Sequence, residues 1–325
     1  MLTTIVSPIK NAPFSPPLVF AKLPSPIDVK SIRMIINSLK TDSITKLLVS
    51  ILLGFSVLHT SLAARKDEII DIVFDLDWTL ISEIEDNLQD HGEVLEISGK
   101  KYRMSNWAKE MLTLLADRPN VRISFYSGGD DARNTEILKK TILPGKNVSA
   151  FDLAYKVLSK DDMEEVSNDT SLRFSQRFKK NVGKINKNLG NIILIDDVLN
   201  FLLENQQGNL LWLGPTFNHY QTYELVKEAR RLDPTNKYIP KNKAQWKLNH
   251  DKLIIIYGII DEALEATKNN QKSFAQNVQS VAKKYKLEHA AYNHEITKLV
   301  KKYQPILKSA RSQLQTCLQF IYQSS

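Results

Sequence analysis

The feature that most constrains the fold is a short apolar run that ends in two acids. Residues 69–74 are rich in β-branched side chains, Asp75 and Asp77 follow directly, and Thr79 lies two positions later. Such a run predicts a strand buried on both faces of a parallel sheet. In open α/β sheets the chemistry lies at the carboxyl ends of the strands, where both acids stand. The alternative is an ordinary acidic loop after a strand.

A second strand is predicted at residues 121–126, where apolar and polar side chains alternate. Ser127, Gly128 and Gly129 follow it. A hydroxyl at the end of a strand, followed by glycines, allows backbone N–H groups to approach an anion. Taken alone, the serine is typical of a turn.

A third apolar run, residues 191–195, predicts another buried strand, and it ends in the acid pair Asp196 and Asp197. The stretch before it, residues 177–184, is basic and includes Lys180. Each feature alone is typical of a helix cap or a solvated surface. Their order, with acids and a hydroxyl at the ends of strands, indicates a catalytic site.

The set resembles the haloacid dehalogenase (HAD) superfamily, in its aspartate-nucleophile phosphatase branch. Within it, residues 68–245 look most like the NLI-interacting-factor group, which includes the small carboxy-terminal-domain phosphatases. The matching residues are 75–79 for the first motif, Ser127 for the second, Lys180 for the third, and Asp196 with Asp197 for the fourth. Trp78 and Asp197 depart from the usual residues of the group. The resemblance implies an α/β fold, a Rossmann-like parallel sheet with a minimal cap.

The first-motif residues have distinct expected roles. A phosphate monoester dianion repels a carboxylate, so attack by Asp75 requires a divalent cation between them. Asp75 would form an aspartyl-phosphate, and Asp77 would protonate the leaving oxygen and then deprotonate the hydrolytic water. Thr79 would orient Asp77.

The other motif residues would hold the metal and the phosphoryl group. Mg²⁺ prefers hard oxygen ligands and keeps several waters, so one or two carboxylates suffice. Asp75, with Asp196 or Asp197, supplies them, and the resemblance adds the backbone carbonyl of Asp77. Lys180 would offset transition-state charge, while phosphoryl oxygens would bind to Ser127, Gly128 and Gly129.

The substrate prediction rests on what covers the site. Residues 80–120 hold a predicted hairpin, with strands at 93–97 and 100–104, and a helix. Residues 159–171 form a polar flap that is too short for a globular cap. An open site favours a phosphorylated protein side chain over a small metabolite. A phosphotransferase, or a catalytically idle HAD-fold module that binds a partner, are the alternatives.

The amino-terminal part is predicted to lie outside the phosphatase domain, which we place at residues 65–246. Residues 1–33 are rich in proline and are interpreted as disordered or as a mis-assigned extension. Residues 34–64 have basic residues, an apolar centre and small residues at the end, which predicts a signal peptide and an exported protein, periplasmic or secreted. The alternatives are a membrane anchor and a buried core helix.

Residues 247–325 form a predicted helical extension. Apolar residues recur at helical spacing, Pro305 is expected to separate two helices, and residues 254–260 fit a helix or a strand. The favoured interpretation is that these helices pack on the catalytic domain or on each other, and an arm that binds a protein partner or a membrane is the alternative. The extension is basic, but no nucleic-acid motif accompanies it, so we predict no specific nucleic-acid partner.

Composition agrees with a folded enzyme. The 325 residues are 42% hydrophobic and 25% charged, values typical of a globular protein. The net charge of +8 favours acidic or phosphorylated partners. The single cysteine, Cys317, excludes an internal disulfide and a cysteine-based zinc site, and no phosphate loop surrounds it as a nucleophile would require.

Overall fold

The computed structural model describes residues 68–84, 92–286 and 292–324. Two compact units, Met1–Ser61 and Leu62–Ser325, divide the chain, and every described residue belongs to the second. The predictions for residues 1–33 and 34–64 therefore concern residues outside the described ranges.

The prediction of a signal peptide and of a secreted protein is corrected here. That prediction depended only on residues 34–64, which lie outside the described residues, and no feature of the described residues supports a signal peptide. The pattern was not specific, because a short apolar run followed by small residues also occurs in anchors and in buried helices. Among the described residues, no helix combines the length and the apolarity needed to cross a bilayer.

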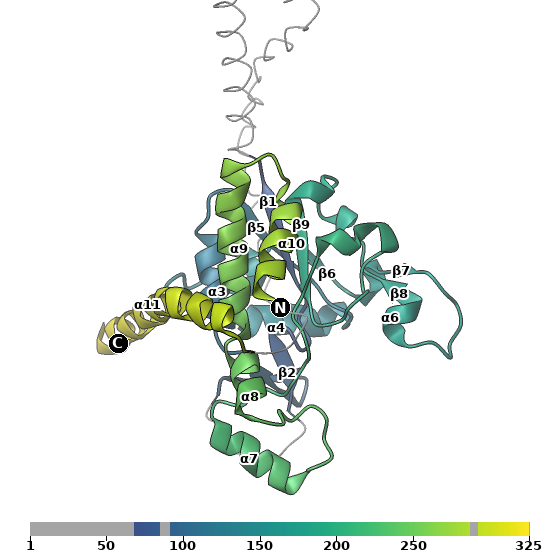
Figure 1. Cartoon of the computed structure of the whole chain (residues 1–325). Helices are drawn as coiled ribbons and strands as arrows, with labels where there is room; N and C mark the ends of the chain where they lie inside the picture. The colour runs from purple at the N-terminus through teal and green to yellow at the C-terminus, as the bar shows by residue number, and fades with distance from the viewer. Residues whose placement is uncertain (1–67, 85–91, 287–291, 325) are drawn as a thin grey trace, which may run out of the picture. The chain divides into compact units, whose positions relative to one another are not determined.

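A parallel five-stranded sheet forms the centre of the described unit (Figure 1), so the predicted α/β fold is confirmed. Its strands, in spatial order, are β10 (Leu210–Trp212), β9 (Ile192–Asp196), β1 (Ile70–Phe74), β5 (Val121–Tyr126) and β6 (Val157–Leu158). The three strands predicted from apolar runs are β1, β5 and β9. Every residue of β1 and β9 is buried, as expected for strands covered on both faces.

Alternate residues of these strands enter two different cores. Ile72 and Ile193 belong to a large core that also contains residues of α3 (Ala108–Ala116) and α9 (Lys252–Asn269). Val73 and Leu194 belong to a smaller core on the other face. β1 lies between β9 and β5, so its carboxyl end sits in the middle of the sheet edge.

The two gaps between the motifs hold small insertions. The first contains a three-stranded antiparallel sheet of β2 (Ile81–Glu83), β4 (Lys100–Met104) and β3 (Val94–Ile97). The predicted hairpin is thus confirmed, and Ser98 and Gly99 both have positive φ, as a tight hairpin turn requires. The second contains the hairpin of β7 (Glu164–Glu165) and β8 (Phe178–Lys179). Neither insertion, as far as described, is a globular cap.

Helices cover the sheet and continue beyond it. Besides α3 and α9, they are α4 (Asp131–Lys140), α5 (Ala150–Leu153), α6 (Phe174–Arg177), α7 (Tyr223–Leu232), α8 (Lys243–His250), α10 (Phe274–Tyr285) and α11 (His294–Ser324). Short 3-10 helices are η1 (Lys160–Asp162), η2 (Val182–Lys184), η3 (Leu189–Asn191) and η4 (Glu204–Asn209).

The carboxy-terminal helices pack on the sheet domain, which is the arrangement we favoured. The ambiguous residues 254–260 lie in α9 and are all buried, as expected for a helix inside a core. At Gly258 a Cβ atom would lie 2.8 Å from the Tyr303 ring, so glycine lets α11 approach α9 closely. Arg311 of α11 also binds Glu110 of α3, at 2.6 Å between Nε and Oε1.

Pro305 does not separate two helices, contrary to our prediction. It lies inside the continuous helix α11. A proline removes one backbone hydrogen bond, but burial of Tyr303 and Leu307 on either side favours continuation. On this part of α11, Tyr303, Leu307 and Ala310 are buried, whereas Ile306 is exposed.

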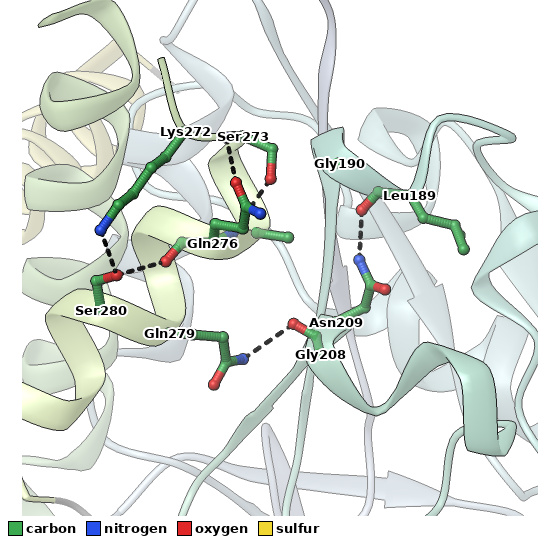
Figure 2. Close-up of a pocket in the computed structure, with 10 residues that line it drawn as sticks. Leu189, Gly190, Gly208, Asn209, Lys272, Ser273, Gln276, Gln279 and Ser280 are labelled. Carbon is green, nitrogen blue, oxygen red and sulfur yellow. Dashed lines mark hydrogen bonds between the residues drawn. The ribbon is translucent and has the colours of Figure 1, made fainter. Parts of the chain in front are cut away.

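A groove of about 550 Å³ lies between α10 and the loops that carry η3 and η4 (Figure 2). Gln279 crosses it and donates from Nε2 to the carbonyl of Leu210, at 2.7 Å. The lining residues are Leu189, Gly190, Gly208, Asn209, Lys272, Ser273, Ala275, Gln276, Gln279 and Ser280. None of the predicted site residues is among them, so this groove is separate from the acids.

Candidate active site

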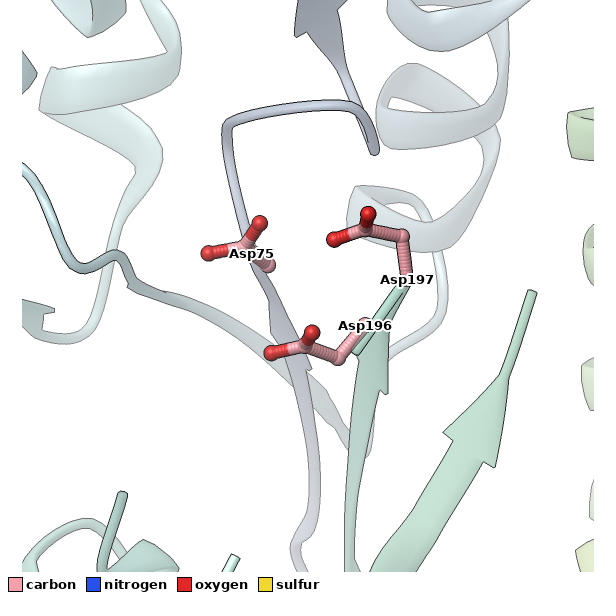
Figure 3. A group of neighbouring side chains, drawn as sticks. All are labelled: Asp75, Asp196 and Asp197. Carbon is pink, nitrogen blue, oxygen red and sulfur yellow. The ribbon is translucent and has the colours of Figure 1, made fainter. Parts of the chain in front are cut away.

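Three acids meet at the carboxyl ends of β1 and β9 (Figure 3). Asp75, Asp196 and Asp197 each place a carboxylate oxygen within 4.8 Å of the others. The cause is the register of the sheet: Phe74 pairs with Ile195, and the Asp75 amide donates to the Ile195 carbonyl at 2.9 Å. Adjacent parallel strands therefore release their acids side by side.

Lys180 joins two of these acids. Its Nζ atom donates to Asp75 Oδ1 and to Asp196 Oδ2, both at 2.7 Å, and its side chain is fully buried. Burial alone would lower the pKa of Lys180, but the charges of Asp196 and Asp75 outweigh it and raise that pKa above its ordinary value. The neighbouring lysines point elsewhere: Lys179 binds the carbonyls of Ser175 and Asn200.

The negative charge of the cluster is not fully compensated. Burial raises the pKa of Asp75 well above its ordinary value, and Asp196 adds to this while Lys180 opposes it. Burial, together with Asp196, also raises the pKa of Asp197 to about 6, although Thr216 donates a hydrogen bond to its Oδ2 atom at 2.9 Å. Only two of the three carboxylates contact the Lys180 ammonium, and together the three fit the hard-oxygen donor set of a divalent cation.

Asp77 has its own cation, which the sequence interpretation missed. Arg133 of α4 donates to the Asp77 carboxyl group from both terminal nitrogens, and its Nη1 atom lies 3.0 Å from Oδ2. Ser127 donates to the same oxygen at 3.3 Å, and the Gly129 amide donates to the Ser127 hydroxyl at 3.2 Å. The sequence offered one sign of this contact, which is the position of Arg133 in the first turn of the helix that follows the glycine loop.

Thr79 does not orient Asp77, contrary to the expected role. Its Oγ1 atom is buried and has no hydrogen-bond partner among the described residues. Its carbonyl oxygen accepts a hydrogen bond from the Ser105 hydroxyl, at 2.8 Å. Arg133 and Ser127 hold Asp77 instead.

Aromatic rings flank the acids and the glycine loop. Trp78 has a positive φ of 60° and stacks on Tyr238, with ring centroids 4.9 Å apart. On the other side, the Phe174 ring of α6 lies 3.0 Å from the point where a Cβ atom of Gly128 would be. Tyr238 and Phe174 are partly exposed, so exposed aromatic rings lie next to the first motif and next to the glycine loop.

A buried hydrogen-bond chain connects α8 to the first motif. Asn249 Nδ2 can only donate, so the His219 Nδ1 atom 3.2 Å away accepts, and its protonated Nε2 faces the Ser105 hydroxyl at 2.7 Å. Ser105 then donates to the Thr79 carbonyl. Burial lowers the pKa of His219 to about 3, so the ring is neutral at pH 7.

Comparison with known proteins gave no family model and no curated sequence that matches the chain. Several solved structures are similar in part, and two of them are structures of the phosphatase Fcp1. One is that of Fcp1, an essential RNA polymerase II CTD phosphatase, with 15% identity and a TM-score of 0.39 over 69% of this chain and 73% of the other. The second is a single-residue variant of the fission yeast RNA polymerase II CTD phosphatase Fcp1, bound to beryllium fluoride. Its identity to this chain is 14% and the TM-score is 0.33, over 75% of this chain and 69% of the other. Likeness at this level assigns no function to the chain.

Proposed function

We propose that the chain is a Mg²⁺-dependent phosphomonoester hydrolase of the HAD type. The observation that carries the proposal is the pairing of two acids two residues apart, each with its own cation. Asp75 is buried beside Lys180 and the other acids, whereas Asp77 is half-buried beside Arg133 and Ser127. Two carboxyl groups in different environments suit a nucleophile and an acid–base group.

Asp75, Asp196 and Asp197 are the residues that would hold the metal. When bound, Mg²⁺ would reduce the repulsion between the Asp75 carboxylate and a phosphate dianion. Burial raises the pKa values of Asp75 and Asp197, and the charge of Asp196 raises them further, so a cation bound among these acids would stabilise their ionised forms.

The chain's own residues account for both steps of hydrolysis. Asp75 attacks phosphorus, and the bond from phosphorus to the leaving oxygen breaks as Asp77 donates a proton to that oxygen. Asp77 then removes a proton from water, which attacks the aspartyl-phosphate, releases phosphate and restores Asp75. Lys180, fixed by two hydrogen bonds, offsets negative charge beside Asp75 throughout.

The phosphoryl oxygens would bind at the loop after β5. The Ser127 hydroxyl already lies 3.3 Å from Asp77, which places the loop beside the acid that must reach the leaving group. The amides of Gly128 and Gly129 belong to the same turn, and backbone N–H groups of such a turn can approach an anion. The Gly129 amide donates to the Ser127 hydroxyl, so of these two amides that of Gly128 is the one we assign to a phosphoryl oxygen.

We further propose a phosphorylated protein side chain as the substrate. The Asp77 side chain is 38% exposed, and the described insertions are a small sheet and a hairpin rather than a globular cap. A phosphorylated residue on a protein surface could therefore reach the acids. A small metabolite phosphate is the competing substrate class.

The test is hydrolysis of p-nitrophenyl phosphate by the purified protein with Mg²⁺ or with EDTA. Turnover should require Mg²⁺ and should fall by at least about 10³-fold in Asp75→Asn, with Asp117→Asn, at the surface end of α3, as the matched control. Undiminished turnover in Asp75→Asn would refute the nucleophile. A panel of phosphopeptides and small phosphate esters then compares the substrate classes by kcat/KM.

A further inference from the structure

We infer that Arg133 is a positioning residue that fixes the Asp77 carboxyl group and leaves a single lone pair of Oδ1 for proton transfer. The inference rests on the proposed function, since it says how the Asp77 carboxyl group, the acid–base group of that reaction, is held in position. It concerns a residue outside all four sequence motifs.

The hydrogen-bond capacity of Asp77 is nearly filled. An ionised carboxylate has about four lone-pair sites on its two oxygens. Oδ2 accepts from Arg133 Nη1, at 3.0 Å, and from Ser127 Oγ, at 3.3 Å. Oδ1 accepts from Arg133 Nη2. One site on Oδ1 remains. It would carry the proton when Asp77 acts as the acid and would accept a proton from water when Asp77 acts as the base. The side chain is 38% exposed, so a leaving oxygen or a water can reach this site.

Arg133 is itself held in place. Its Nε atom donates to the Tyr102 hydroxyl at 3.3 Å, and its guanidinium carbon lies 5.0 Å from the centre of that ring. Nη1 also donates to Asn134 Oδ1, at 3.2 Å. A Cβ atom on Gly129 would overlap Nη1, so glycine at this position allows the arginine to pass. The guanidinium fork is therefore pre-organised rather than mobile.

The same contacts argue against Arg133 as a direct ligand of the phosphoryl group. A guanidinium has five N–H donors. Four of them are engaged by Asp77, Tyr102 and Asn134. A residue that receives substrate phosphate would need two free, parallel donors to bind in a bidentate manner. Arg133 thus acts on the reaction through Asp77.

A positioning role predicts an effect that depends on the leaving group. Proton donation matters most when the leaving alcohol is a poor one, and general acid catalysis contributes about 10²- to 10⁴-fold. For Arg133→Gln we expect kcat/KM to fall by about 10²-fold or more with an alkyl phosphate. With p-nitrophenyl phosphate, whose leaving group needs little protonation, it should fall less than about fivefold on the same reasoning.

The experiment measures kcat/KM for both esters in the wild type, Arg133→Gln, Arg133→Lys and Tyr102→Phe, with Glu136→Gln on the same helix as control. Lysine keeps the charge but not the fork, so it should not rescue. In an Asp77→Asn background, Arg133→Gln should have no further effect. Equal losses on both esters, or a weaker inhibition by inorganic phosphate, would overturn the inference. An inactive wild type would instead refute the proposed function, and the inference with it.

Discussion

Replacing Lys180 with methionine should destabilise the metal-free protein strongly. The substitution removes two hydrogen bonds of 2.7 Å and leaves Asp75 and Asp196 buried without their cation. A hydrogen bond to a charged group is worth about 1.5–3 kcal/mol, and breaking a buried ion pair costs about 3–5 kcal/mol. We expect the free energy of unfolding to fall by about 3–5 kcal/mol, which lowers Tm by roughly 10 °C for a unit of this size.

Urea unfolding in EDTA, followed by circular dichroism, measures this loss. Lys184→Met is the matched control, because Lys184 forms a partly exposed pair with Glu164 and should cost less than about 1 kcal/mol. Adding Asp196→Asn to Lys180→Met should recover part of the stability, since it removes one uncompensated acid. Mg²⁺ should stabilise Lys180→Met more than the wild type. A loss no larger than that of Lys184→Met would refute the assignment of Lys180 as the cluster's compensating charge.

Three further predictions concern other parts of the site and the core. Burial lowers the pKa of His219 from its ordinary value of about 6.5 to about 3, so the unfolded chain binds a proton below pH 6.5 that the folded protein does not. This group should therefore reduce the free energy of unfolding by about 2 kcal/mol at pH 5. In urea titrations at pH 6.5 and at pH 5, His219→Gln should show a smaller loss of stability than the wild type. Tyr238→Ala removes the ring stacked on Trp78 and should lower kcat/KM for phosphopeptides more than for p-nitrophenyl phosphate. Gly258→Ala forces a methyl group against Tyr303 and should lower unfolding stability by about 1–3 kcal/mol in thermal denaturation.

Local sequence patterns predicted the strands that carry the acids. The runs that became β1 and β9 are short, rich in β-branched residues and bounded by polar groups, and burial on both faces requires that composition. Once two such strands are parallel neighbours, the acids that follow them must meet. This part of the site follows from position along the chain alone.

Contacts made by side chains across long separations were not predictable in this way. Arg133 lies 56 residues from Asp77, and the composition of α4 gives no sign that one of its basic residues turns toward the acids. Tyr238 lies far beyond the last motif and reaches Trp78 only because the chain after β10 returns to the site. The helix boundary predicted at Pro305 was wrong, because burial of side chains in the core outweighed the tendency of proline to end a helix.

The two acids of the first motif contact different cations although they are two residues apart. Asp75 lies at the edge of the sheet, where Lys180 supplies a buried charge. Asp77 lies beyond the end of the strand, where its half-exposed side chain pairs with Arg133 of α4. Because each acid has its own cation, the proposed mechanism can assign Asp75 as the nucleophile and Asp77 as the group that exchanges a proton.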